Sequence, residues 1–295
     1  KLNSKMLQIC LLFALLASVN GIQVYTKEAL ADKIIKLPGS DSLDITFNQF
    51  SGYLSIPGAN GDSKQMHYWL VESMNTPISD PLVFWTNGGP GCSGLIGFMT
   101  EQGPFQPNAD GTLKFNDYAW NKVANMVFIE SPAGVGFSYS DEKSDYVNGD
   151  DQTAEDNYNL IQAFLVRFPL FSNNSLYITS ESYGGHYMPT LAKQIVDSNT
   201  AGENPTINFK GFAVGNPYTN VYSGTPAMID TFWGHQLIAK PYYDSYQSDC
   251  VNAFIPRVKE CIQLLVEINN GIGDLNPYAL DYPVCTASSG KKSGR

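Results

Sequence analysis

A serine-bearing turn is the first feature of this sequence that predicts chemistry. The stretch Tyr177–Tyr187 reads YITSESYGGHY, and its part from Ser180 to Gly184 fits the nucleophile pattern G-x-S-x-G except at the first position. In that pattern a sharp strand-to-helix turn strains the serine backbone, so the residues two places before and after it should be small. Ser182 is therefore a candidate nucleophile, and an ordinary turn with a capping serine is the alternative.

A serine hydroxyl is a poor nucleophile until a histidine takes its proton and an acid orients that histidine. The chain has three histidines, His67, His186 and His235. His186 lies one helical turn beyond Ser182, from which it cannot easily reach back. His67 lies in an early hairpin, and His235 in a region without strand patterns. We interpret all three as structural or surface residues.

The elements that must position the serine are predicted from short apolar runs that end in glycine-rich or polar loops. In order they are PLVFW before TNGGPG, NMVFIE before SPAGVG, SLYIT before SESYGG, and INFKGFAV before GNP. A hairpin at a sheet edge is predicted over Phe50–Ile56 and Met66–Glu72. A helix is predicted over Asp151–Phe168, capped by Thr153 with Asp156, and another after the serine turn. This alternation predicts a doubly wound α/β sheet with its sites at the carboxyl ends of the strands.

Composition limits the compartment and the partners. The balance of 28 acidic against 18 basic residues argues against a nucleic-acid partner. Lys1 and Lys5 precede the apolar run MLQICLLFALLASV, which is too short to span a bilayer, so residues 1–21 are expected to be a signal peptide and no stable membrane association is expected. We expect residues 22–220 to form the core, and 221–295 to begin a lid or insertion.

Cysteines and one sequon agree with the secretory pathway. Cys92, Cys250, Cys261 and Cys285 follow the predicted signal peptide, and four cysteines permit three disulfide pairings. Asn173 begins an N-x-S glycosylation sequon. No CxxC pair or Cys/His cluster predicts a metal site, and no cofactor is expected.

Five ordered stretches carry a specific resemblance. They are WTNGGPGCSG, TEQGPF, NMVFIESPAGVGFSYS, YITSESYGGHYMP and KGFAVGNP. In this order and spacing they resemble the serine carboxypeptidases of peptidase family S10, and MHYWLVES and GFSYSDEKSD are similar to its lysosomal cathepsin A branch. The resemblance covers roughly residues 47–285. It implies an α/β-hydrolase fold, a mixed sheet with helices on both faces and a helical or irregular lid, whose C-terminal strands this chain does not reach.

The resemblance also implies residue roles. Ser182 would form an acyl-enzyme, and the backbone N–H groups of Tyr183 and Gly89 would bind the developing oxyanion. The implied binders of the substrate's terminal carboxylate are Asn87, Gly88, Glu101 and Glu181. Closely placed carboxyl groups share protons at acidic pH, and a neutral carboxyl can donate a hydrogen bond to a carboxylate. Binding is therefore expected to favour mildly acidic conditions.

The resemblance places the catalytic Asp and His beyond residue 295. It pairs Cys250 with Cys261, and Cys92 and Cys285 with cysteines further along. We therefore expect an N-terminal part of a longer enzyme that folds poorly and is inactive alone. The expected enzyme is a secreted, lysosomal or vacuolar serine carboxypeptidase acting on peptides or proteins, with a homodimer left open. An acyltransferase, or a non-catalytic binding or chaperone-like relative, is the alternative.

Overall fold

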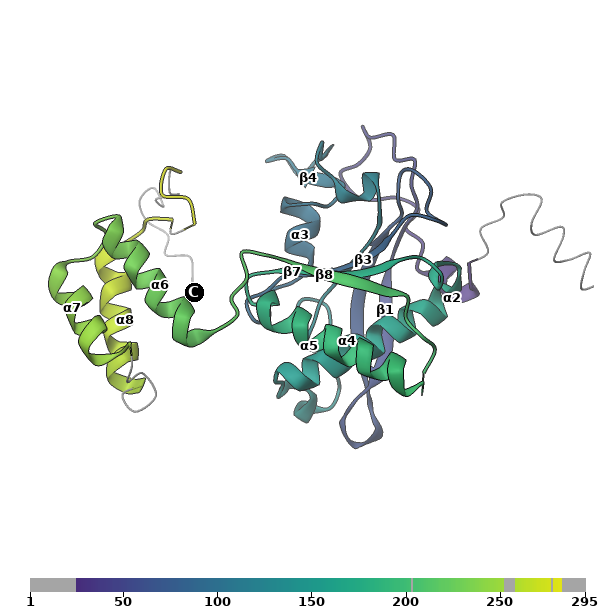
Figure 1. Cartoon of the computed structure of the whole chain (residues 1–295). Helices are drawn as coiled ribbons and strands as arrows, with labels where there is room; N and C mark the ends of the chain where they lie inside the picture. Colours follow the sequence, from purple (N-terminus) through teal and green to yellow (C-terminus); the bar gives the residue numbers. More distant parts are fainter. Residues whose placement is uncertain (1–24, 203, 252–257, 277, 283–295) are drawn as a thin grey trace, which may run out of the picture. The chain divides into compact units, whose positions relative to one another are not determined.

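The computed structural model describes residues 25–202, 204–251, 258–276 and 278–282 (Figure 1). The predicted signal peptide and Cys285 lie outside these residues. Contacts divide the chain into two compact units after Tyr218. Each unit is described separately below.

The first unit contains a mixed six-stranded sheet in the order β1-β2-β6-β3-β7-β8. β1 and β2 form the predicted antiparallel hairpin, and β1 lies at the sheet edge. β2 pairs antiparallel with β6, whereas β6, β3, β7 and β8 pair parallel. The strands are β1 (Gln49–Pro57), β2 (Ser63–Val71), β3 (Leu82–Thr86), β6 (Asn125–Ile129), β7 (Leu176–Glu181) and β8 (Phe209–Gly215). The predicted α/β class is confirmed.

Helices and a small hairpin cover the two faces of this sheet (Figure 1). α4 (Asp150–Arg167) and α5 (Gly184–Ala201) pack on one face, where Phe164 and Leu191 meet Ile178 of β7. On the other face Phe98 of α3 (Leu95–Thr100) packs against Phe128 of β6. The remaining elements of this unit are α2 (Lys27–Ala31), β4 (Phe105–Pro107), β5 (Leu113–Phe115), and the 3-10 turns η1 (Ala59–Gly61), η2 (Trp120–Lys122), η3 (Lys143–Tyr146) and η4 (Pro169–Phe171).

The start of α4 differs from the prediction. The helix begins at Asp150 after Gly149, and no side chain caps it. Thr153 is buried inside the first turns, and Asp156 accepts two hydrogen bonds from Lys64 Nζ at 2.9 and 2.7 Å. The predicted cap was therefore wrong, because a buried lysine on β2 takes the carboxylate that the capping pattern had assigned to the helix end.

The second unit is more regular than its sequence predicted. Its described residues form the helices α6 (Val221–Gly234), α7 (Lys240–Asp249) and α8 (Val258–Ile272). Ile229, Tyr246 and Ile268 are buried in its small core. The Cys250–Cys261 disulfide joins the end of α7 to α8, as the resemblance implied. Pro241 lies in the first turn of α7, where proline is tolerated, so a proline-rich sequence did not exclude a helix.

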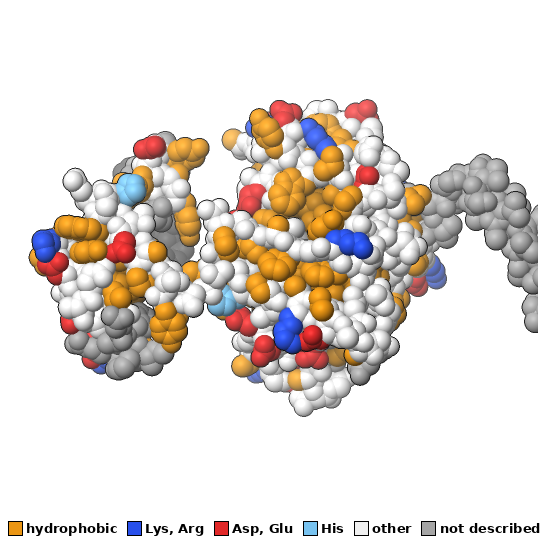
Figure 2. Space-filling view, in the orientation of Figure 1, with side chains coloured by type: hydrophobic (Ala, Val, Ile, Leu, Met, Phe, Trp, Pro, Cys, Tyr) orange, Lys and Arg blue, Asp and Glu red, His pale blue; other side chains and the backbone are white. Residues whose placement is uncertain are grey.

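The outer side of β8 carries apolar side chains that the described residues leave exposed. Figure 2 shows hydrophobic side chains gathered over this part of the first unit. Phe212 of β8 is about half exposed, and Tyr177 of β7 lies at a neighbouring position of the sheet. β8 is the last strand of the described sheet order.

Among the described helices, none has the length and apolar character needed to cross a bilayer.

Candidate active site

The serine turn connects β7 to α5 and holds Ser182 in a strained backbone conformation. Ser182 has a φ of 53°, a left-handed value that is uncommon for a residue other than glycine. Its N–H donates to the Gly215 carbonyl at 2.9 Å, and its own carbonyl accepts from the Tyr218 N–H at 2.7 Å. The segment after β8 therefore fixes the turn from both sides. Ser182 itself is exposed, as a nucleophile must be.

Ser180, the departure from the glycine pattern, is accommodated without an unpaired hydroxyl. It is buried, and its Oγ donates to the Thr86 carbonyl of the neighbouring β3 at 2.7 Å. A Cβ atom placed on Gly184 would lie 2.1 Å from Ser180 Oγ. The two ends of the pattern therefore touch each other. A serine fits at the first position because glycine occupies the last one.

The NGGPG loop after β3 lies directly against this turn. A Cβ atom on Gly88 would lie 2.5 Å from the Tyr183 nitrogen and 3.0 Å from Ser182 Cβ. Gly89 has a φ of 110°, and a Cβ there would lie 2.8 Å from the Cys92 nitrogen. Gly88 is therefore required for the close approach, and Gly89 for the conformation of the loop itself. This approach brings the loop backbone beside the first amide of α5, the arrangement in which two N–H groups can stabilise an oxyanion.

Asn87 joins the two predicted glutamates. Its Nδ2 donates to Glu101 Oε1 at 3.2 Å and to Glu181 Oε1 at 2.9 Å. Its Oδ1 accepts from Trp85 Nε1 at 2.9 Å and from the Gly97 N–H at 3.0 Å. Two donors on Oδ1 fix the orientation of this buried amide, so the NH₂ group must face the glutamates. Of the three residues, Glu181 directly precedes Ser182 on the turn.

The pKa of Glu101 depends on its surroundings. Partial burial and the nearby charge of Glu181 raise the pKa of Glu101, and the hydrogen bond from Asn87 opposes this shift. A raised pKa keeps the Glu101 carboxyl neutral to a higher pH than usual. A neutral carboxyl can donate a hydrogen bond. In mildly acidic solution a neutral Glu101 can therefore donate to an anionic group, while the two Nδ2 protons of Asn87 hold the glutamates in place.

The described histidines all contact groups other than Ser182. His186 stacks its ring on Tyr183, with 4.7 Å between centroids, and its Nδ1 lies 3.8 Å from Asp150 Oδ2. His67 is buried on β2, and its Nδ1 lies 2.9 Å from Glu130 Oε2. His235 lies in the second unit, where its Nδ1 lies 2.9 Å from the Thr231 carbonyl. Among the described residues no histidine therefore hydrogen-bonds to Ser182.

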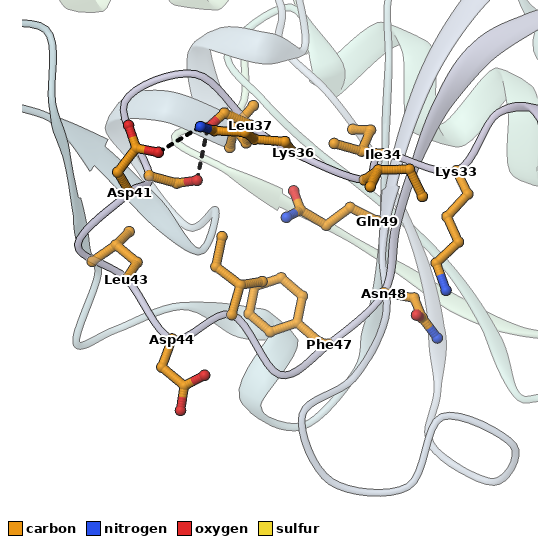
Figure 3. Close-up of a pocket in the computed structure, with 13 residues that line it drawn as sticks. Lys33, Ile34, Lys36, Leu37, Asp41, Leu43, Asp44, Phe47, Asn48 and Gln49 are labelled. Atoms are coloured by element: carbon orange, nitrogen blue, oxygen red, sulfur yellow. Dashed lines mark hydrogen bonds and ion pairs between the residues drawn. The ribbon is translucent and has the colours of Figure 1, made fainter.

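A cavity of about 380 Å³ adjoins the glutamate cluster, with Trp85, Glu101 and Glu181 among its walls. A larger cavity of about 500 Å³ lies among residues 33–49 (Figure 3). Its Lys36 pairs with Asp41 at 2.8 Å, and both side chains are largely exposed. None of its lining residues belongs to the serine turn or the NGGPG loop. We therefore assign the chemistry to the smaller cavity.

Two features of this site were not found from the sequence. Trp85 orients Asn87, and Gly97 leaves room for the indole, since a Cβ there would lie 2.3 Å from Trp85 Nε1. A tryptophan two places before a loop asparagine was the available signal.

The structure also describes Cys92 as an exposed free thiol and Asn173 as exposed. No group of three potential metal ligands occurs among the described residues.

Comparisons with known proteins agree with this geometry. The family model described as serine carboxypeptidase matches residues 38–294. Serine carboxypeptidase-like 28 of Arabidopsis thaliana is 43% identical over 97% of the chain and 62% of its own length. Lysosomal protective protein of Mus musculus is 41% identical over 88% of the chain and 54% of its own length.

A solved structure shares the fold. The crystal structure of a prohormone-processing carboxypeptidase from Saccharomyces cerevisiae matches with a TM-score of 0.72 and 21% identity, over 83% of this chain and 58% of that one. The chain spans about 60% of the length of the curated relatives that it matches. With the family model covering most of the sequence, this chain belongs to the serine carboxypeptidase family, peptidase S10.

Proposed function

We propose that this chain carries the nucleophile and the carboxylate-binding site of a serine carboxypeptidase that removes single C-terminal residues from peptides. The observation that carries the proposal is Asn87, whose amide joins Glu101 and Glu181 directly beside Ser182. A donor cluster one residue from the nucleophile sets the distance between a terminal carboxylate and the bond to be cleaved. Endopeptidases have no need of such a cluster.

In the proposed mechanism Ser182 Oγ attacks the last peptide carbonyl, and the C-terminal amino acid leaves. The Gly89 and Tyr183 N–H groups stabilise the oxyanion, and water then hydrolyses the acyl-enzyme. The base that takes the serine proton and its orienting acid belong to the whole protein, outside the residues described here. The 295-residue chain alone is accordingly expected to lack peptidase activity.

We also propose that the whole protein acts in the secretory pathway, at the cell exterior or in a lysosome or vacuole. The Cys250–Cys261 disulfide and the exposed sequon at Asn173 support this location. The printed name of the mouse relative, lysosomal protective protein, agrees with it. A glycosidase-sensitive shift in the mass of the purified protein would test the sequon, and an unmodified Asn173 peptide would contradict this part of the proposal.

The proposed function is tested with two blocked dipeptides that differ only at the C-terminus. The whole protein should cleave the peptide with a free carboxylate at least tenfold faster, in kcat/KM at pH 5, than the same peptide as an amide. The carboxylate of the free acid accepts a stronger, charge-assisted hydrogen bond from a neutral Glu101 than the amide oxygen does. Equal rates would contradict carboxypeptidase action, and transfer of acyl groups to an added alcohol without hydrolysis would favour an acyltransferase.

A further inference from the structure

A second cavity adjoins the serine turn, and none of its lining residues belongs to the glutamate cluster. It has a volume of about 500 Å³, and Pro90, Asp150, Tyr183 and Tyr187 are among its walls. Glu181 and Tyr183 flank Ser182 in the chain, and each lines a different cavity. The serine turn therefore borders both cavities.

Like the serine turn, the NGGPG loop contacts both the glutamate cluster and the second cavity. Asn87 contacts the glutamate cluster at one end of this loop, and Pro90 lines the second cavity at the other. The proposed oxyanion donors, Gly89 and Tyr183, lie at the border. If the terminal carboxylate binds at Asn87, the leaving residue occupies the first cavity. The acyl part of the substrate then extends from Ser182 toward the second cavity.

The second cavity combines aromatic walls with one carboxylate. Asp150 Oδ1 accepts a hydrogen bond from the Tyr183 hydroxyl at 3.1 Å, which holds the carboxylate in place. The Asp150 side chain is 37% exposed, and His186 Nδ1 lies 3.8 Å from it. No Lys or Arg is found among the described residues that line this cavity. Aromatic faces and a carboxylate together favour a cation.

We propose that this cavity binds a positively charged side chain on the acyl side of the cleaved bond, and that Asp150 is the residue that selects for it. The orientation of the substrate in this inference rests on the proposed function. The selectivity for charge rests on the cavity itself.

A purely structural role for Asp150 is the alternative, because a carboxylate in the first turn of a helix interacts favourably with the helix dipole. The chain contains a matched control for this alternative. Asp151 is the next residue of α4, is exposed, and does not line this cavity. Both carboxylates lie in the first turn of α4, but only Asp150 lines the cavity.

The test compares two blocked dipeptides with the same C-terminal residue and either lysine or norleucine before the cleaved bond. These side chains have similar length and differ in charge. The whole protein should cleave the lysine peptide about fivefold faster in kcat/KM. In Asp150→Asn this ratio should fall to about one, and Asp150→Glu should restore most of it. Asp151→Asn should keep the ratio of the unmodified protein.

The ratio is measured within each preparation, so a partly unfolded variant still gives a valid result. A ratio near one in the unmodified protein, or an unchanged ratio in Asp150→Asn, overturns the inference. Binding of acetyl-lysinamide and acetyl-norleucinamide, followed by ligand-observed NMR, separates the two proposals. If neither dipeptide is cleaved, the proposed function fails; lysinamide binding that depends on Asp150 then supports the cavity assignment, and equal binding of the two amides overturns it.

Discussion

Two serines in this molecule have the surroundings of a hydrolase site, each in a different way. Ser51 Oγ lies 2.9 Å from His67 Nε2, and His67 Nδ1 lies 2.9 Å from Glu130 Oε2, in the order serine, histidine, acid. Ser182 has no histidine partner among the described residues. It has instead a strained backbone, an exposed position and a glycine loop packed against it.

The Ser51 array lacks what a substrate needs. Ser51 lies within the regular antiparallel pair of β1 and β2, and it lines none of the cavities described above. The rings of Tyr53 and Phe137 meet the His67 ring edge-on. The contact from Nδ1 to Glu130 also lacks the angle of a hydrogen bond. Residue order alone therefore does not make a catalytic site, whereas access and oxyanion donors do.

The acid of this array has a structural role. Burial tends to raise the pKa of Glu130, but contacts from His67, Ser93 and the Phe137 N–H lower it below its ordinary value. A Cβ on Gly136 would lie 1.8 Å from Glu130 Oε1, so the loop after β6 closes tightly over the carboxylate. Glu130 thus ties this loop to Ser93, just after the NGGPG loop.

Removing each serine hydroxyl in the whole protein tests most directly which of the two serines is the nucleophile. Ser182→Ala should lower kcat for a blocked dipeptide by about 10⁴-fold or more, because the acyl-enzyme can no longer form. Ser51→Ala should change kcat by less than about threefold, a value typical of a residue outside the reacting centre. Steady-state kinetics measure both. A large loss in Ser51→Ala with full activity in Ser182→Ala would reverse the assignment.

The next effect concerns the glycine loop. Gly88→Ala places a methyl group 2.5 Å from the Tyr183 nitrogen, so the loop and the turn must move apart. We expect kcat to fall about 100-fold, since a displacement of about 1 Å has that consequence for positioned groups. Gly234→Ala is the control, because a Cβ there meets nothing within 4 Å. Equal kcat values in the two variants would show that the loop does not need its close approach.

Glu130→Gln sharpens the structural side of the comparison. It should lower the free energy of unfolding by about 2 kcal/mol at pH 7, because a buried charged partner is lost. The folded pKa of Glu130 is depressed, so its contribution is present above the ordinary value of 4.5 and is lost as pH falls through the lower folded value. Urea unfolding at pH 7 and pH 3.5 measures the difference, with Glu155→Gln on the surface as control. A difference that grows toward pH 3.5 would contradict the sign.

The smallest expected change is in a pH profile. As pH rises through the raised pKa of Glu101, its carboxyl ionises and repels the substrate's carboxylate, so kcat/KM falls. Glu101→Gln cannot ionise and should flatten the decline between pH 5 and pH 7 by about threefold. Glu155→Gln should leave the profile unaltered. An unchanged pH profile in Glu101→Gln would show that ionisation of Glu101 does not control binding of the substrate's carboxylate.

Much of the sheet could be predicted from the sequence, because buried parallel strands are continuous apolar runs that end in glycine loops. The helices of the second unit were underestimated, because proline in the first turn of a helix such as α7 does not interrupt it. The Thr153 cap failed because Asp156 is required by Lys64, 92 residues away. Such partners depend on sheet order, which a local pattern does not contain.

The candidate site also contains some residues that the sequence could predict and others that it could not. Ser182 was predicted from a motif, and the roles of the glutamates from the family resemblance, because the chemistry fixes their residue types. The amide orientation set by Trp85, the contact of Ser180 with Gly184, and the position of Asp150 depend on how separate segments pack. The Ser51, His67 and Glu130 array was also invisible, because it joins three strands through their register.

The central claim is that Ser182, and not Ser51, is the reactive serine. The most direct measurement is treatment of the whole protein with diisopropyl fluorophosphate, followed by digestion and mass spectrometry. We predict one phosphoryl adduct on the peptide that contains Ser182, formed in parallel with the loss of peptidase activity, and none on the peptide that contains Ser51. An adduct on Ser51, or full inactivation with Ser182 unmodified, would contradict the account.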